Sequence, residues 1–172
     1  MALITEDGTA KADAESLASV AFADTHHANR GNTAWAALTT AAKEAALRKA
    51  TDHIGAVYGQ RWDGSRVSST QALDWPRYDV PKREGAYSRV PAYYVSNQVP
   101  AAVQRACAEL ALRASAGDLA PDQSQAIKRK RVEGAVDVEY QDFSSAAPRY
   151  PAIDGLLAPF LMAGGGTRLV RG

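Results

Sequence analysis

One stretch of the chain, residues 99–116 with the sequence VPAAVQRACAELALRASA, constrains the fold more than any other. Its apolar residues recur at three- and four-residue steps, which places them on one face of a helix about 27 Å long. The residues of this face are Val99, Val103, Ala106, Cys107, Leu110, Ala111 and Ala114. Pro100 suits the first turn, because its missing N–H would have no intrahelical acceptor there, and Gly117 can adopt the left-handed conformation that ends a helix. The width of the face and its small side chains predict the central helix of a mainly helical domain.

Composition limits the class of protein. The chain has 172 residues, enough for one domain with its own core, and a formal net charge of +1. A protein that coats nucleic acid normally carries a clear basic excess, so this balance argues against that class. The single cysteine excludes an internal disulfide and fits a reducing compartment. The first residues are acidic and no window approaches about 20 apolar residues, so we expect neither a signal peptide nor a membrane span.

Periodicity and turn residues divide the rest of the chain into further elements. We predict a mainly α fold, a compact bundle of about four helices with one β-hairpin and extended terminal arms. The expected elements are helices at residues 13–29, 41–58, 100–116 and 151–162 and a hairpin at residues 127–140. Residues 1–163 would form a single domain and residues 164–172 a flexible arm. The side chains expected to be mostly buried are Leu17, Val20, Leu47, Ile54, Val57, Val103, Cys107, Leu110, Leu156 and Leu157.

Candidate caps mark the starts of the first two helices. Asp13, or alternatively Ser16, has a side-chain oxygen that can accept an N–H group in the first turn of the first helix. Thr39 and Thr40 can do the same for the second helix. The sequence also allows a short helical turn at residues 69–73, which would end before a proline.

Residues 60–97 are the least regular part of the sequence, with several prolines and glycines and two of the three tryptophans. A connection of this length without structure of its own is uncommon inside a compact domain. We therefore expect the segment to be ordered around two structural anchors, Trp62 and Trp75, with Pro76 fixing the direction of the backbone. If the indoles were exposed instead, they and the neighbouring arginines would be suited to stacking the bases of single-stranded DNA.

The predicted hairpin carries opposite charges on its two arms. The basic residues are Lys128, Arg129, Lys130 and Arg131, and the acidic residues are Asp137 and Glu139. Opposite charges on facing strands favour the pairing of the arms. The basic run has a second interpretation, as a contact to DNA phosphates or to an acidic protein. Adjacent copies of the chain could also match these charges across a subunit contact.

The sequence offers no convincing catalytic or metal-binding arrangement. His26 and His27 are adjacent, so on a helix they point about 100° apart and cannot share one metal-binding face. His53 is remote in sequence, and a metal site would require all three histidines to converge with a carboxylate. Cys107 lies on the apolar face of its helix, where we expect a small buried hydrophobe rather than a nucleophile. We therefore expect a protein that is not an enzyme and that has no metal and no cofactor.

The most specific part of the sequence is QALDWPR at residues 71–77, preceded by Arg61-Trp62, Gly64 and Arg66. A TTAAKEAALRKATDHI helix comes before it, and the helix at 99–116, the basic and acidic strand pair and a PAIDGLLAPFL helix follow. In this order the chain resembles, over nearly its whole length, a family of tailed-bacteriophage and prophage proteins often labelled DnaT-like single-stranded DNA-binding proteins. The arrangement also resembles phage head–tail connector (adaptor) proteins, which form a ring beneath the portal.

The resemblance implies one of two functions. A connector is a structural virion protein of the neck, and the likeness implies a cyclic homo-oligomer, a dodecamer, that joins capsid to tail after assembly in the host cytoplasm. Its partners would be the portal protein, a downstream neck or tail-completion protein, and packaged double-stranded DNA in weak contact at most, with no membrane. The alternative, a DnaT-like single-strand binder, needs a basic groove with exposed aromatic side chains. A connector needs a small rigid helical body, one irregular loop, a hairpin and terminal arms, so we favour the connector.

The C-terminal arm also fits the connector interpretation. After a run of glycines it carries Arg168, Leu169, Val170 and Arg171. A short arm of this kind is costly to order alone and is best explained by a partner that receives it. We expect it to dock on the portal or on a neighbouring copy, with Leu169 and Val170 buried and the arginines against acidic groups.

Overall fold

The computed structural model describes residues 2–82, 92–121, 129–132, 136–139 and 148–162. Within these ranges the chain forms five α-helices, one 3₁₀ helix and two two-stranded sheets. The predicted fold class, mainly α with one β-hairpin, is confirmed. In the described part of the chain, no helix combines the length and the apolarity needed to cross a membrane.

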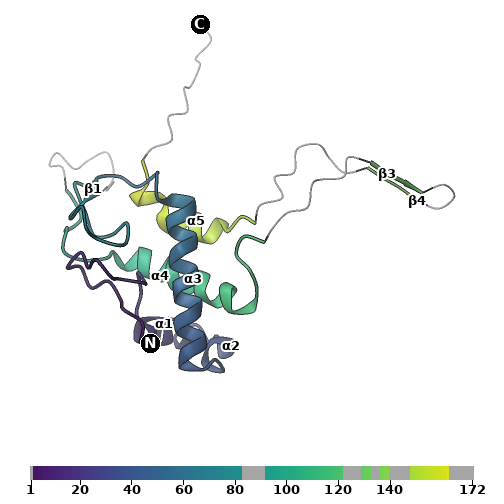
Figure 1. The fold of residues 1–172 in the computed structure, drawn as a ribbon, viewed down its shortest axis with the longest axis horizontal. Helices are drawn as coiled ribbons and strands as arrows, with labels where there is room; N and C mark the ends of the chain where they lie inside the picture. The colour runs from purple at the N-terminus through teal and green to yellow at the C-terminus, as the bar shows by residue number, and fades with distance from the viewer. Residues whose placement is uncertain (1, 83–91, 122–128, 133–135, 140–147, 163–172) are drawn as a thin grey trace, which may run out of the picture.

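The helices α3 (Thr40–Tyr58) and α4 (Ala101–Ala116) pack against each other at the centre of the molecule (Figure 1). Every residue of the apolar face predicted for α4 is buried. The Thr39 hydroxyl accepts the N–H of Ala42 at 3.3 Å, so α3 begins where its cap was predicted. Gly117 follows α4 with a φ of 178°, an extended conformation that any residue adopts, so the expected left-handed C-terminus is wrong.

The first helix is shorter than predicted. Helix α1 (Val20–Ala28) has Ser19 as its N-cap, which accepts the N–H of Phe22 at 3.1 Å. The residues before it are extended, because Ser16 lies beside Thr5 in a parallel bridge and the N–H of Glu6 donates to the Ser16 carbonyl at 2.9 Å. Backbone groups used in this pairing cannot form the first helical turns. Neither Asp13 nor Ser16 therefore caps α1, and residues 13–19 are not helical.

A short helix that the sequence analysis missed follows α1. Helix α2 (Thr33–Ala36) carries Trp35, whose indole N–H donates to the Asp24 carboxylate at 2.7 Å. Lys43 of α3 lies 2.9 Å from the same carboxylate. Helix α2 has only four residues, too few for a helical period to show in the sequence. It exists because Trp35 is buried against His27 of α1 and below the Lys43 ammonium group of α3.

The C-terminal helix ends earlier than predicted. Helix α5 (Pro151–Leu157) continues as the 3₁₀ helix η1 (Ala158–Phe160), rather than as an α-helix to residue 162. Leu161 turns to an extended conformation and forms a bridge with Trp62. The N–H of Met162 then donates to the Arg61 carbonyl at 2.7 Å. This pairing ends the helix and joins the C-terminal segment to the start of the irregular loop.

Both sheets are antiparallel pairs. In the irregular segment, β1 (Ser65–Arg66) pairs with β2 (Arg77–Tyr78), a pairing that the sequence did not predict. Residues 69–73 form turns and bends, so the helical turn allowed there is absent. The predicted hairpin is present as β3 (Arg129–Val132) and β4 (Val136–Glu139), which stand apart from the helical body in Figure 1.

The predicted core is largely correct. The predicted residues that are buried are Leu17, Leu47, Ile54, Val103, Cys107, Leu110 and Leu157. Val20 and Leu156 are only partly buried against this core. Val57 is 45% exposed, so its predicted burial is wrong. Ile54 and Tyr58 lie on the buried face of α3, and Val57 falls beside that face because each residue turns the helix by about 100°.

His27 is a buried polar group that joins α1 to α4. Its Nε2 atom lies 3.0 Å from the Ala108 carbonyl oxygen, and its Nδ1 atom lies 2.9 Å from the side-chain nitrogen of Asn32. A neutral ring with the proton on Nε2 satisfies both contacts, since Nε2–H donates to Ala108 and Nδ1 accepts from Asn32. Burial lowers the pKa of His27 below its usual value, against the opposing effect of the Ala108 carbonyl.

This arrangement predicts a loss of stability in mild acid. Because the pKa of His27 is lower in the folded chain than in the unfolded chain, the unfolded state binds more protons below about pH 6.5. We expect the free energy of unfolding to decrease as pH falls from about 7 to 5, as measured by urea unfolding. His27→Gln should make the free energy of unfolding depend less on pH in this range. His53→Gln is the control, because it removes another histidine whose pKa is lowered by burial and leaves the contribution of His27 in place. An unchanged slope in His27→Gln would contradict the assignment.

Candidate interaction surfaces

The side chain of Gln71 organises the QALDWPR segment from within. Its Oε1 atom accepts the N–H of Ser68 at 2.9 Å, and its Nε2 atom donates to the carbonyls of Leu73 and Pro76 at 2.8 and 3.1 Å. The side chain is buried, so these bonds replace contacts with water. Gln71 therefore fixes the turn that leads into β2 and is not available to a ligand.

The two tryptophans of this segment are buried. Trp75 is fully inaccessible, and its ring centroid lies 5.6 Å from those of both Trp62 and Phe160, nearly perpendicular to each. Pro76, joined to Trp75 by a cis peptide bond, is also fully buried. The indole N–H of Trp62 donates to the Asp74 carboxylate at 3.3 Å. The aromatic side chains that could have stacked on bases instead attach the irregular segment to the C-terminal helices.

Arg77 completes this anchor. Its guanidinium group donates to the carbonyl oxygens of Asp63, Gly64 and Asp74 at 2.8, 2.7 and 3.1 Å. The side chain is buried, and burial lowers its pKa. The guanidinium group of Arg77 therefore binds backbone carbonyls of the loop and is not available to bind a phosphate.

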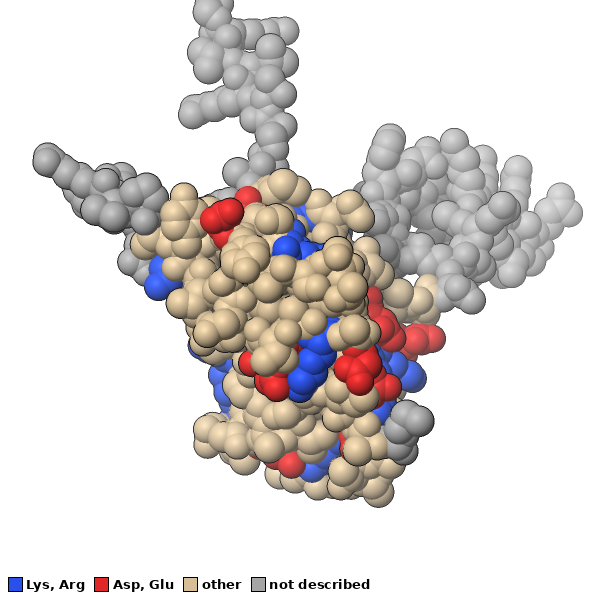
Figure 2. Space-filling view, turned by 60° about the vertical axis from the view of Figure 1, so that its left-hand side comes forward, with Lys and Arg blue, Asp and Glu red and all other residues tan. Residues whose placement is uncertain are grey.

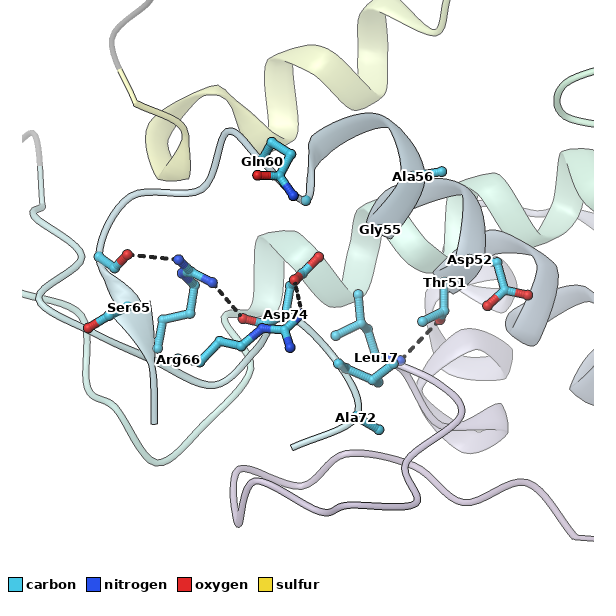
Figure 3. Close-up of a pocket in the computed structure, with 14 residues that line it drawn as sticks. Leu17, Thr51, Asp52, Gly55, Ala56, Gln60, Ser65, Arg66, Ala72 and Asp74 are labelled. Carbon is cyan, nitrogen blue, oxygen red and sulfur yellow. Dashed lines mark hydrogen bonds and ion pairs between the residues drawn. The ribbon is translucent and has the colours of Figure 1, made fainter. Parts of the chain in front are cut away.

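A polar hollow of about 910 Å³ lies between α3 and this segment (Figure 3). Arg66 and Asp74 form an ion pair across it at 2.7 Å. The Asp74 carboxylate lies against Gly59, the residue that follows α3, and a Cβ atom on Gly59 would come within 3.2 Å of this carboxylate. Neither histidine nor cysteine is among the residues that line the hollow. Both arginines of the lining, Arg66 and Arg77, are already bonded to protein acceptors.

A second hollow, of about 570 Å³, lies between the C-terminal half of α3 and α5. We call it the α3–α5 hollow. Two apolar residues of its lining, Val57 and Met162, are 45% and 50% exposed. The Tyr58 hydroxyl donates to the Asp154 carboxylate at 2.6 Å, and this burial and hydrogen bond raise the pKa of Tyr58. Arg61 lies over the ring of Tyr58, with its guanidinium carbon 5.6 Å from the ring centroid. The α3–α5 hollow therefore combines exposed apolar groups with fixed charges.

A narrow ribbon formed by residues 78–82 and 92–95 carries the other exposed apolar groups, and we call it the tyrosine ribbon. Its two segments pair through a bridge between Pro81 and Tyr93 and a hydrogen bond from the N–H of Tyr94 to the Val80 carbonyl at 2.9 Å. Val80 is buried, and the ring of Tyr94 lies 4.8 Å from that of Phe160. Its exposed large side chains are Tyr78, Tyr93 and Val95. The ribbon thus has one side in the core and one side in solvent.

Charges of both signs are mixed on the face of the molecule shown in Figure 2. Lys and Arg lie among Asp and Glu in a band across the middle, and a broad area above this band carries few charges. No continuous basic band crosses the face shown. A protein that tracks a single strand uses a positively charged groove, and the charges on the face shown do not form one.

The register of the hairpin places basic positions of β3 opposite acidic positions of β4. Arg129 lies opposite Glu139, and Arg131 lies opposite Asp137. Lys130, Val132, Val136 and Val138 occupy the positions of the other face. Lys128 lies outside the described residues, as do Arg168, Leu169, Val170 and Arg171 of the C-terminal arm.

The residues weighed for chemistry in the sequence lie in separate places. The rings of His26 and His27 are 5.1 Å apart and nearly perpendicular, and His26 lies 3.0 Å from the Glu109 carboxylate. His53 packs instead against Tyr150. No group of three potential metal ligands occurs among the described residues. The Cys107 thiol is buried, which raises its pKa.

Sequence reasoning identified the tryptophan anchor but missed the tyrosine ribbon and the α3–α5 hollow. The β-favouring residues Tyr93, Tyr94 and Val95 were the sequence signal for the ribbon. The comparisons give one match. A family model described as "Putative DnaT-like ssDNA binding protein" covers residues 1–172. No curated protein and no solved structure matches the chain.

Proposed function

The chain belongs to the family of DnaT-like single-stranded DNA-binding proteins, and we propose that it acts as a structural subunit of a phage head–tail connector. In this role, copies of the chain form a ring beneath the portal in the neck of the virion and join the capsid to the tail. The ring contacts the portal above and a neck or tail-completion protein below. Packaged double-stranded DNA passes through its centre with weak contacts at most.

One observation carries this proposal: all three tryptophans of the chain, Trp35, Trp62 and Trp75, are buried. A single-strand binder stacks successive bases on exposed aromatic side chains along a basic groove. The net charge is only +1, and the mixed charges on the face shown in Figure 2 do not form such a groove. A rigid helical body that exposes apolar groups on a ribbon and in a hollow is instead suited to contacts with other proteins.

Single-stranded DNA binding is the second candidate. The description of the family favours it. Tyr78 and Tyr93 are about half exposed on the tyrosine ribbon, and the Lys82 ammonium group lies 5.6 Å from the centroid of the Tyr94 ring. An exposed aromatic ring contributes about 1–3 kcal/mol for each stacked base. Two such rings without a basic groove predict weak binding that is sensitive to salt.

A reconstituted portal complex tests the proposal. We expect the full-length protein to join a purified portal as a ring, visible by negative-stain imaging. Truncation after residue 163 should weaken this binding, because the arm that carries Leu169 and Val170 is then lost. Undiminished binding of the truncated protein would remove the arm from the mechanism, and failure of the full-length protein to join any portal would remove the connector proposal itself.

Fluorescence anisotropy with a labelled oligonucleotide discriminates the second candidate. We expect affinity no tighter than micromolar at physiological salt, decreasing further as salt is added. Submicromolar affinity for single strands, together with no binding to a portal, would establish the DNA-binding alternative in place of the connector.

A further inference from the structure

We propose that the tyrosine ribbon of one copy of the chain inserts into the α3–α5 hollow of the next copy. This inference rests on the proposed function, because a connector is a ring of identical subunits. It goes further by naming the two surfaces that meet. A ring needs a different surface on each side of the subunit, since the contact runs head to tail.

The exposed apolar groups point to these two surfaces. Five large hydrophobic side chains are exposed in the described part of the chain, and each belongs to one surface or the other. Three of them, Tyr78, Tyr93 and Val95, lie on the tyrosine ribbon, and Val57 and Met162 line the α3–α5 hollow. Tyrosine and methionine are enriched where proteins meet. The ribbon and the hollow thus supply an inserting and a receiving surface on one molecule.

The charges of the two surfaces are complementary. The hollow has Arg61 and Arg149 in its lining and the fixed carboxylate of Asp154. Within the described residues, Arg61 stacks on Tyr58 and has no carboxylate partner. The ribbon exposes Asp79 and Lys82, one charge of each sign. Opposite charges on facing surfaces fix the register of a contact more than they raise its affinity.

Both surfaces belong to one rigid body. Phe160 at the end of η1 contacts Tyr94 of the ribbon and Trp75, and Leu161 beside it lines the hollow and bridges to Trp62. The angle between ribbon and hollow is therefore fixed by the fold, so every contact in a chain of copies repeats the same rotation. A constant rotation is what allows a head-to-tail assembly to close into a ring. A second copy is accordingly the occupant that this geometry favours.

Two single variants and their mixture test the contact. We expect the full-length wild-type protein to associate as its concentration rises, as measured by sedimentation velocity. Tyr93→Glu on the ribbon and Val57→Glu in the hollow should each remain monomeric. An equimolar mixture of the two variants should form dimers and nothing larger, because one intact ribbon and one intact hollow remain. Ala45→Glu, at an exposed position of α3 outside both surfaces, should associate like the wild type.

Several results would overturn the inference. These are a wild-type protein that stays monomeric at its highest soluble concentration, variants that still associate, or a mixture that forms no dimers. Loss of oligonucleotide binding in Tyr93→Glu with association intact would assign the ribbon to DNA instead. These results can be told apart from a failure of the connector proposal. If the connector proposal alone were wrong, the wild type would associate through these two surfaces and yet join no portal. If both variants joined the portal ring normally, the connector proposal would stand and only the contact between ribbon and hollow would be wrong.

Discussion

Trp75→Ala is expected to lower the free energy of unfolding by about 3–5 kcal/mol, the usual loss when a large buried aromatic side chain is removed. The indole is fully buried and contacts Trp62 and Phe160, so its loss leaves a cavity between the irregular segment and the C-terminal helices. Because Phe160 also supports Tyr94, the tyrosine ribbon should loosen with it. Urea unfolding followed by circular dichroism measures the loss.

Trp75→Phe is the matched control. The indole N–H of Trp75 is buried and has no hydrogen-bond acceptor among the described residues, so its removal leaves no partner unsatisfied. We expect this variant to lose clearly less stability than the alanine variant, because an aromatic ring remains against Trp62 and Phe160. A Trp75→Ala protein that unfolds within about 1 kcal/mol of the wild type would contradict the anchor. If that protein also lost only oligonucleotide affinity, single-stranded DNA binding would be favoured.

The central helices could be predicted because their burial follows from local periodicity. The apolar residues of α4 repeat at helical spacing through the whole element, and α3 has a threonine cap at its start. The helix pair then buries these faces together, so the prediction needs no knowledge of the rest of the chain. The hairpin was predictable for the same reason, since β-favouring residues flank a Glu-Gly pair in the sequence.

Elements that depend on distant partners could not be predicted. Residues 13–19 have the composition of a helix start, but their backbone pairs with residues 4–6 and is held extended. Helix α2 exists because Trp35 is held by Asp24 of α1, a contact that no local pattern indicates. In both places, contacts outside the local window decide the structure, and these override propensity.

In the candidate surfaces too, features that follow from local sequence could be predicted and features that depend on distant contacts could not. The tryptophans of the QALDWPR segment were recognisable as anchors, because large aromatic residues in a long loop are normally buried. The exposure of Tyr93 depends on pairing between residues 80–82 and 92–94, which the intervening residues 83–91 separate in sequence. The exposure of Val57 depends on the position of α5, which leaves this side of α3 uncovered. Neither fact is contained in a short stretch of sequence.

Gly64→Ala is expected to cost about 4 kcal/mol, because it combines two unfavourable effects. Gly64 has a φ of +69°, a left-handed conformation that disfavours side chains. A Cβ atom there would also lie 1.9 Å from the Tyr78 carbonyl oxygen, so the backbones of the two segments must separate. Their separation would break the bond from Arg77 to the Gly64 carbonyl and displace the ribbon that begins at Tyr78. We expect loss of self-association together with loss of stability.

Gly31→Ala isolates the backbone effect from the steric effect. Gly31 has a φ of +67°, almost the same as Gly64, yet a Cβ atom there would meet no heavy atom within 4 Å. Its substitution should cost only the left-handed penalty, about 1–2 kcal/mol, and should leave association intact once the protein is folded. The difference between the two variants in urea unfolding measures how tightly the loop at Gly64 closes on β2. Equal losses of unfolding free energy in both variants would mean that the segment carrying the tyrosine ribbon deforms at little cost. The proposed contact between copies requires a fixed angle between the tyrosine ribbon and the α3–α5 hollow, so it would then lose its structural basis.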